Sequence, residues 1–196
     1  FVMIGTAEDH HSNPLKIAIS KFKRGGGRFI SINPVRTGYS AIADEWLGIR
    51  PGTDGLFILS LVHELLRAGK IDADYLARYT NSPWLVIQDR GGAEDGLFYR
   101  VEGAPQVYDR KRKKIVSALD PDAAPSLSGE YELPDGRKAV PSFMLLAERY
   151  LSSEYAPEAV TERTGIPVAT IRRIAAELAH VAFEQEIVVE QPWTDW

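Results

Sequence analysis

The chain has 196 residues, 44% of them hydrophobic, with a net charge of −4 and a pI near 5.6. This length and apolar content are enough to bury the core of one domain, or of one domain with an insertion. The acidic balance argues against a nucleic-acid or anionic-membrane surface, because such surfaces are usually basic. No apolar run approaches the roughly 20 residues of a membrane-spanning helix. The absence of cysteine excludes disulfides and thiolate-ligated metal or iron–sulfur sites within these residues.

Both ends of the chain are apolar or aromatic. It begins with the run Phe1–Ile4 and stops at Trp193–Trp196, which contains two tryptophans. Natural termini are usually polar and frayed. We therefore expect an internal part of a longer protein, and composition leaves its compartment open.

The N-terminal part predicts a strand, a helix and a second strand. Phe1–Ile4 is a continuous apolar run, typical of a strand buried on both faces, and Gly5 ends it. Asn13, followed by proline, is a strong helix start, and three glycines at 25–27 end that helix. The second strand is Phe29–Ile32. This succession is a βαβ unit, in which the two strands run parallel.

Two turns follow the second and third predicted strands. Asn33-Pro34 stops the second strand, because proline removes a donor from the ladder. Another extended piece, Trp46–Ile49, leads through a turn into an apolar helix at Gly55–Ala68, with Thr53 or Asp54 as its cap. Open α/β sheets bind ligands beyond the carboxyl ends of their strands. We therefore expect the two turns to face one crevice.

The rest of the chain alternates between β-like and helical patterns. A short helix is predicted at Ile71–Tyr79, and residues 84–140 contain short β-like runs broken by Gly, Pro and Asp. This stretch predicts an irregular excursion with β-hairpins, peripheral to the core. Helices are expected at 142–152, 157–163 and 167–182, and a closing strand at Glu186–Glu190. The fold class is α/β, with a mostly parallel sheet and a β-rich insertion.

The turn Arg50–Gly55 places backbone N–H groups, the hydroxyl of Thr53 and the carboxylate of Asp54 together. A carboxylate there matches two neighbouring donors of guanine, N1–H and the exocyclic amine. Read alone, such a run is more often a helix cap after a turn. In the preceding turn, Arg36 could supply charge to a phosphate and Thr37 a donor, although a surface arginine in a turn is the simpler interpretation.

Other motifs are weaker indications of ligand or metal binding. Gly5 stands without the further glycines of GxGxxG, which disfavours ordinary NAD binding, and Asn33 stands where an acid often holds a ribose. The loop Glu8–His11 resembles a metal-ligand set in composition, but adjacent side chains diverge, so a solvated loop is favoured. We predict no catalytic residue and no metal ligand in this chain.

Residues 157–182 also resemble a helix-turn-helix, with Gly165 in the turn and Arg172 and Arg173 on the second helix. A DNA-binding helix needs cations around it that contact phosphates. The flanks instead carry four glutamates, Glu158, Glu162, Glu177 and Glu184. Packing of two amphipathic helices is therefore favoured over a DNA-binding regulator, and a non-catalytic α/β scaffold is the other alternative.

Taken together, the motifs resemble those of the molybdopterin oxidoreductases of the dimethyl sulfoxide reductase family. They are Ile32-Asn33-Pro34-x-Arg36-Thr37, 43–46 (ADEW), 49–54 (IRPGTD), 69–76 (GKIDADYL), 79–80 (YT), 155–158 (YAPE), 164–167 (TGIP) and 171–172 (IR). Their order and spacing are more specific than any single motif. The resemblance covers both ends of the chain and leaves about 88–140 unmatched. It departs at Ala7, where the family commonly has asparagine.

The resemblance implies a Rossmann-like, three-layer domain over 1–196 that holds the guanosine end of a molybdopterin guanine dinucleotide. The residues it implies for binding are Gly5, Asn33, Pro34, Arg36, Thr37, Gly52, Thr53 and Asp54. Those after the second strand would line the ribose and phosphate. Those after the third strand would meet the guanine, and Gly5 would give a close turn after the first strand.

For the whole protein, the resemblance implies the catalytic subunit of a molybdenum-dependent oxidoreductase with a bis-molybdopterin guanine dinucleotide cofactor. An iron–sulfur cluster would lie outside this segment, if the protein has one. The expected partners are the remaining domains of the same polypeptide and electron-transfer subunits. This segment alone is expected to be inactive, and its sequence does not indicate the substrate.

Overall fold

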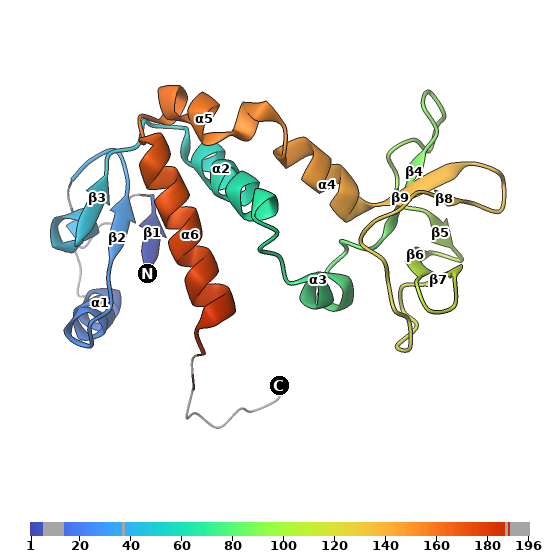
Figure 1. Cartoon of the computed structure of the whole chain (residues 1–196), viewed down its shortest axis with the longest axis horizontal. Helices are drawn as coiled ribbons and strands as arrows, with labels where there is room; N and C mark the ends of the chain where they lie inside the picture. The colour runs from blue at the N-terminus through green and yellow to red at the C-terminus, as the bar shows by residue number, and fades with distance from the viewer. Residues whose placement is uncertain (6–13, 37, 187, 189–196) are drawn as a thin grey trace. The chain divides into compact units, whose positions relative to one another are not determined.

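The computed structural model describes residues 1–5, 14–36, 38–186 and 188 (Figure 1). The chain forms two compact units. The parallel-sheet unit consists of Phe1–Lys70 and Ser153–Trp196, and the hairpin unit consists of Ile71–Ser152. In the described part of the chain, no helix has the length and apolar character needed to cross a membrane.

The parallel-sheet unit is built on three strands, β1 (Val2–Ile4), β2 (Ile30–Ile32) and β3 (Glu45–Leu47). They lie in the order β1-β2-β3, and both pairs are parallel. Ile4 is in register with Ile32, and Ile32 with Leu47, so all three strands end at the same edge of the sheet. The predicted parallel arrangement is confirmed.

The helices of this unit begin and end close to the predicted positions. They are α1 (Pro14–Arg24), α2 (Asp54–Arg67), α5 (Pro157–Thr164) and α6 (Val168–Glu184), with 3₁₀ turns η1 (Gly38–Ile42) and η2 (Ser153–Tyr155). α1 begins at a proline, which suits the first helical position, and carries three cations in its last turn, where they complement the helix dipole.

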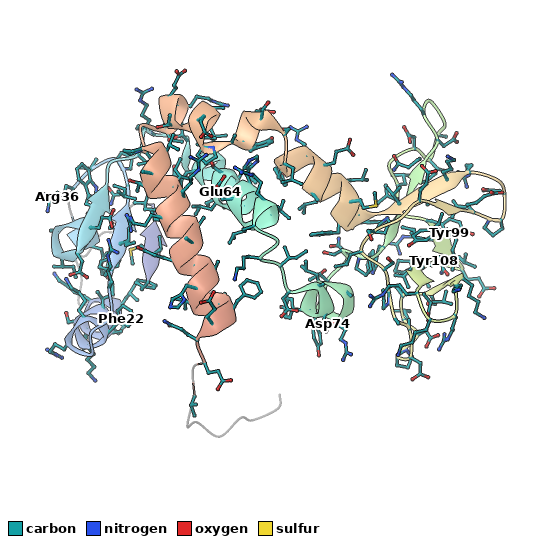
Figure 2. The ribbon with its side chains drawn as sticks, in the orientation of Figure 1. Phe22, Arg36, Glu64, Asp74, Tyr99 and Tyr108 are labelled. Carbon is teal, nitrogen blue, oxygen red and sulfur yellow. The ribbon has the colours of Figure 1, made fainter. Side chains whose placement is uncertain are left out.

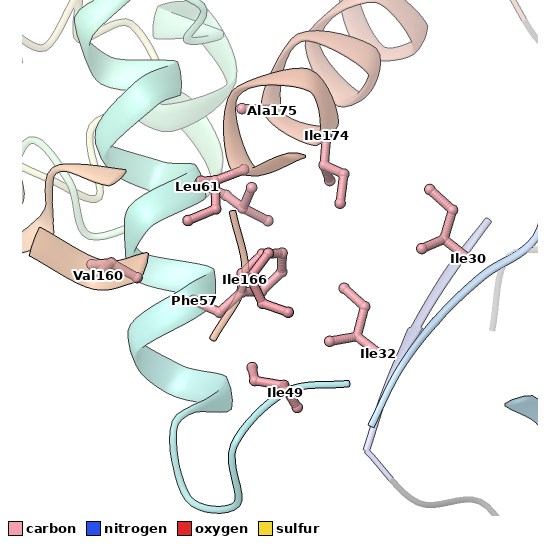
Figure 3. Close-up of a cluster of buried hydrophobic side chains, with 10 residues drawn as sticks. Ile30, Ile32, Ile49, Phe57, Leu61, Val160, Ile166, Ile174 and Ala175 are labelled. Atoms are coloured by element: carbon pink, nitrogen blue, oxygen red, sulfur yellow. The ribbon is translucent and has the colours of Figure 1, made fainter. Parts of the chain in front are cut away.

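Both faces of the central strand β2 are buried, and its successive residues point to opposite sides of the sheet. Ile30 and Ile32 pack into a cluster with Phe57 of α2 and Ile174 of α6 (Figure 3). On the opposite face, Phe29, which precedes β2, packs with Ile19 of α1 and Tyr39 of η1. Helices on both faces are the usual setting of a parallel sheet, so the α/β class is confirmed.

The hairpin unit contains two antiparallel sheets and two helices. One sheet has the order β4-β9-β8, with strands Leu85–Gln88, Lys138–Pro141 and Tyr131–Glu132. The other has the order β5-β6-β7, with strands Arg100–Val101, Ala104–Asp109 and Lys114–Ser117. The helices are α3 (Ala73–Tyr79) and α4 (Ser142–Tyr150).

The insertion is β-rich, as the sequence predicts, but β8 and β9 were not expected. Both are short and are joined by a turn containing Pro134 and Gly136. The expectation of a single cofactor-binding domain stays a prediction. The closing strand predicted at Glu186–Glu190 falls largely outside the described residues.

Candidate functional site

The carboxyl ends of the three parallel strands bring Gly5 and Asn33 to one edge of the sheet. The backbone N–H of Gly5 donates to the carbonyl of Ile32 at 2.9 Å, and that of Asn33 donates to the carbonyl of Leu47 at 3.2 Å. Gly5 has a φ of 100°, which side-chain-bearing residues rarely adopt, and among the described residues a Cβ added there would meet no atom within 4 Å. Gly5 therefore brings no side chain to this turn, and the residues that follow it, 6–13, lie outside the described part of the chain.

Asn33 is almost fully buried, with 3% of its surface exposed, and its side chain is engaged inside the protein. Its Oδ1 accepts a hydrogen bond from the N–H of Val35 at 2.7 Å, and its Nδ2 donates to Ser40 Oγ at 2.6 Å. Ser40 Oγ lies 2.7 Å from Ser31 Oγ, and both serines are fully buried. Asn33 thus shapes the turn that presents Pro34 and Arg36.

Arg36 lies at the surface of this unit (Figure 2). Its guanidinium carbon lies 6.0 Å from the centroid of the Trp46 ring, within the range of a cation–π contact. The indole N–H of Trp46 donates to the carbonyl of Asn33 at 3.1 Å. None of the described carboxylates forms an ion pair with Arg36. Its charge is therefore available to an anion.

The second turn, after β3, is tied to the end of α5. The N–H of Arg50 donates to the carbonyl of Thr164 at 2.9 Å, and its guanidinium donates to the carbonyl of Glu162 at 2.6 Å. Gly52 has a φ of 77°, and no atom of the described residues lies within 4 Å of the position that a Cβ would take. Asp54 is half-buried in the first turn of α2 and, within the described chain, has no ion-pair partner.

The prediction that a side chain caps the N-terminus of α2 is wrong. Thr53 occupies the N-cap position, but its hydroxyl donates to the carbonyl of Arg50 at 2.7 Å rather than accepting from the helix. The hydroxyl therefore closes the turn at 50–53. The first N–H groups of α2 receive no side-chain cap from Thr53.

Some sequence-predicted positions cannot be placed. Thr37, Ala7 and the loop Glu8–His11 lie outside the described residues. Over the ranges that the structure describes, no group of three or more His, Cys, Asp or Glu side chains is arranged to hold a metal ion.

The cations of the helix-turn-helix-like pair are engaged by carboxylates. Arg172 pairs with Glu158 and lies 3.5 Å from Glu64, and Arg173 pairs with Glu177 and Glu45. These two arginines of α6 therefore form ion pairs within the protein. This arrangement does not favour a DNA-binding regulator.

Sequence reasoning missed three residues that shape the first turn, namely Ser31, Ser40 and Trp46. Trp46 belongs to a matched motif, so it carried a signal that was not used. The serines carried none, because their contact joins β2 to η1 across a turn.

The hairpin unit has a separate cavity of about 660 Å³, bordered by α3, α4 and residues 125–128. Arg110, Asp74 and Glu148 stand among its lining residues. The cavity contains none of the residues predicted to bind a ligand.

Known proteins are similar to this chain over most or all of its length. The chain is 53% identical to a sulfite dehydrogenase subunit of Allochromatium vinosum, over all of this chain and 21% of that protein. It is 26% identical to the nitrate-inducible formate dehydrogenase major subunit of Escherichia coli, over 91% of this chain and 17% of that protein. It is 29% identical to a putative dimethyl sulfoxide reductase catalytic subunit of Halobacterium salinarum, over 80% of this chain and 19% of that protein.

The chain therefore spans about a fifth of the length of these relatives, whose names describe them as subunits. Among solved structures, acetylene hydratase from Pelobacter acetylenicus matches 93% of this chain and 16% of its own, with a TM-score of 0.51 and 17% identity. That similarity supports the fold alone. No family model matches the sequence.

Proposed function

Because the chain belongs to the dimethyl sulfoxide reductase family of molybdopterin oxidoreductases, we propose that it binds the guanosine end of a molybdopterin guanine dinucleotide. It would do so as part of the catalytic subunit of a molybdenum-dependent oxidoreductase. When bound, the bis-molybdopterin guanine dinucleotide cofactor supplies a molybdenum that carries out oxygen-atom or hydride-equivalent transfer. This chain's share is to bind and orient the nucleotide end.

The observation that carries the proposal is the shared edge at which the three parallel strands end. Two features there fit a nucleotide diphosphate. The Arg36 guanidinium, without a carboxylate partner among the described residues, offers charge and directed donors to phosphate oxygens. The lack of a side chain at Gly5 would let a phosphate or ribose approach the backbone closely. Asn33 and Pro34 complete this side by forming the turn, and Thr37 would add a donor.

In the second turn, the half-buried carboxylate of Asp54 would accept hydrogen bonds from guanine N1–H and the exocyclic amine. Gly52 gives the base room, since a side chain there would occupy the open space beside the turn. Thr53 holds the turn closed through its bond to Arg50. The roles differ accordingly: Asp54 recognises the base, whereas Gly52 and Thr53 shape the turn.

Removal of the Asp54 carboxylate tests the proposal. In the full-length enzyme, Asp54→Ala should weaken cofactor binding tenfold or more, because hydrogen bonds to a charged group contribute about 1.5–3 kcal/mol. Molybdenum and guanine released per polypeptide measure the effect. The matched control is Asp95→Ala, which removes a carboxylate that accepts from the N–H of Asp89 in the hairpin unit. Equal cofactor content in the two variants would contradict the proposal.

The substrate to test first is sulfite. The identity to the sulfite dehydrogenase subunit is 53%, against 26% to the formate dehydrogenase subunit. We expect the full-length enzyme, with its electron-transfer subunits, to oxidise sulfite faster than formate. A preference for formate in a side-by-side assay would overturn this assignment without affecting the cofactor proposal.

A further inference from the structure

We propose that Ser40, with Ser31 and Trp46, is a positioning residue that holds the turn Asn33–Arg36 in the form that presents Arg36 to an anionic diphosphate. The inference rests on the proposed function and deepens it. It assigns a role to three residues that do not themselves meet the nucleotide.

The first step is the orientation of the Asn33 amide. The N–H of Val35 can only donate, so the atom 2.7 Å away must be the amide oxygen. The amide nitrogen is then the atom that donates to Ser40 Oγ at 2.6 Å. Both ends of the side chain are therefore fixed, one on the turn itself and the other on η1.

The second step is the rigidity of the anchor. Ser40 has no exposed surface and lies in η1, and its hydroxyl also contacts Ser31 Oγ on β2 at 2.7 Å. The turn is thus tied by Asn33 and Ser40 to the strand that precedes it. Buried hydrogen bonds of this kind are costly to break, because a group left unpaired keeps its full desolvation penalty.

The third step concerns Trp46, which contacts the turn at two points. Its indole N–H donates to the Asn33 carbonyl at 3.1 Å, and its ring lies beside the Arg36 guanidinium at 6.0 Å. The ring attracts the cation without using the five N–H donors in hydrogen bonds. Arg36 is therefore oriented while its donors stay available.

The test is a double-mutant cycle on the cofactor-loaded full-length enzyme. The variants are Arg36→Ala, Ser40→Ala and the pair of them, and the readout is the rate at which bound guanine is lost on dialysis. We expect roughly tenfold faster loss for Arg36→Ala, since a charge-assisted contact is removed, and about fivefold for Ser40→Ala. If Ser40 acts through Arg36, Ser40→Ala should have no further effect in the Arg36→Ala background.

The matched control is Ser60→Ala in α2. Ser60 is also fully buried, but its hydroxyl has no hydrogen-bond partner in the described part of the chain. Its removal should leave guanine loss unchanged. Ser31→Ala is a milder variant that keeps the bond between Ser40 and Asn33, and it should accelerate loss less than Ser40→Ala. Thermal unfolding of each variant identifies any that fail to fold.

The outcomes separate the two proposals. If Arg36→Ala releases guanine at the wild-type rate, the proposed function is wrong at this residue, and the inference falls with it. Suppose instead that Arg36→Ala accelerates the loss of guanine. If Ser40→Ala then has no effect, or has the same effect with and without the Arg36 side chain, Ser40 is merely structural. In that case the inference is overturned and the proposed function stands.

Discussion

The charged side chains in the turns of the hairpin unit form ion pairs, unlike those that the structure describes in the two turns at the edge of the parallel sheet. In the hairpin unit, Arg112 pairs with Asp120, and Arg137 pairs with Asp135 and Glu94. These partners raise the pKa of both guanidinium groups and lower the pKa of Asp120 and Asp135. The hairpin unit thus uses its turn charges to hold its own loops.

The edge of the parallel sheet is different. Arg36 and Asp54, on the two turns, have no ion-pair partner among the residues that the structure describes. Turn charges that satisfy one another stabilise a loop, whereas unpaired ones cost little when solvated and remain available for binding. The two units therefore differ in the use of their turn charges: those of the hairpin unit pair with one another, whereas Arg36 and Asp54 remain unpaired among the described residues.

The largest expected effect comes from removing a core side chain in each unit. Phe57→Ala should lower the free energy of unfolding of the parallel-sheet unit by about 3–5 kcal/mol, and Leu85→Ala that of the hairpin unit by about 2–5 kcal/mol. Both side chains have no exposed surface. Hydrogen exchange should rise mainly around α2 in the first variant and β4 in the second. A uniform rise throughout the chain in either variant would contradict the division into two units.

A smaller effect is expected at Asp109, the last residue of β6, where the chain enters the turn to β7. Its buried carboxylate accepts from the N–H groups of Arg112 at 2.9 Å and Lys111 at 2.8 Å, and these bonds hold its pKa below the ordinary value. Asp109→Ala should therefore lower the melting temperature of the hairpin unit by several degrees.

The pH dependence of that effect follows from the sign of the pKa shift. A carboxyl group whose pKa is lowered on folding stabilises the folded state fully above its unfolded pKa of about 4. This stabilisation is lost as the pH falls through the lower pKa of the folded state. The difference between wild type and Asp109→Ala should be full at neutral pH and shrink below about pH 4. A difference that grows in acid would show that the carboxylate is not the stabilising form.

The smallest effect is expected at the opposite end of the parallel strands, where charges are paired. Arg28, Glu45, Arg173 and Glu177 form a closed ring of four ion pairs that joins the sheet to α6. Glu45→Gln should cost about 1 kcal/mol, because partly exposed pairs are weak individually. The loss should decrease in high salt, as screening weakens the pairs in the wild type. Cofactor content should not change.

The sequence predicted the elements whose signals are local. Pro14 and the glycines after Arg24 bound α1, and Asp72 caps α3 by accepting from the N–H of Tyr75 at 2.8 Å. The strands β8 and β9 were missed because they are short and each is stabilised by pairing with a partner rather than by its own pattern.

The candidate site was predictable at the level of turns but not of side-chain roles. The proline and glycines placed the turns correctly, since these residues restrict the backbone directly. Which atoms of Asn33 and Thr53 are free depends on neighbours that the fold brings near, such as Ser40. Local spacing does not reveal that Asn33 is buried.

The buried amide of Asn33 also constrains the direction of proton donation. Since its nitrogen donates to Ser40, the proton of the Ser40 hydroxyl points away from the amide, and Ser31 Oγ at 2.7 Å is an acceptor within its reach. An aspartate at this position would reverse that direction, because the serine would have to give its proton to the carboxylate. It would also bury a negative charge beside a turn proposed to receive a phosphate. The amide of Asn33 therefore matches the two serine hydroxyl groups beside this turn, whereas an acid of nearly the same shape would require the Ser40 proton to turn toward it.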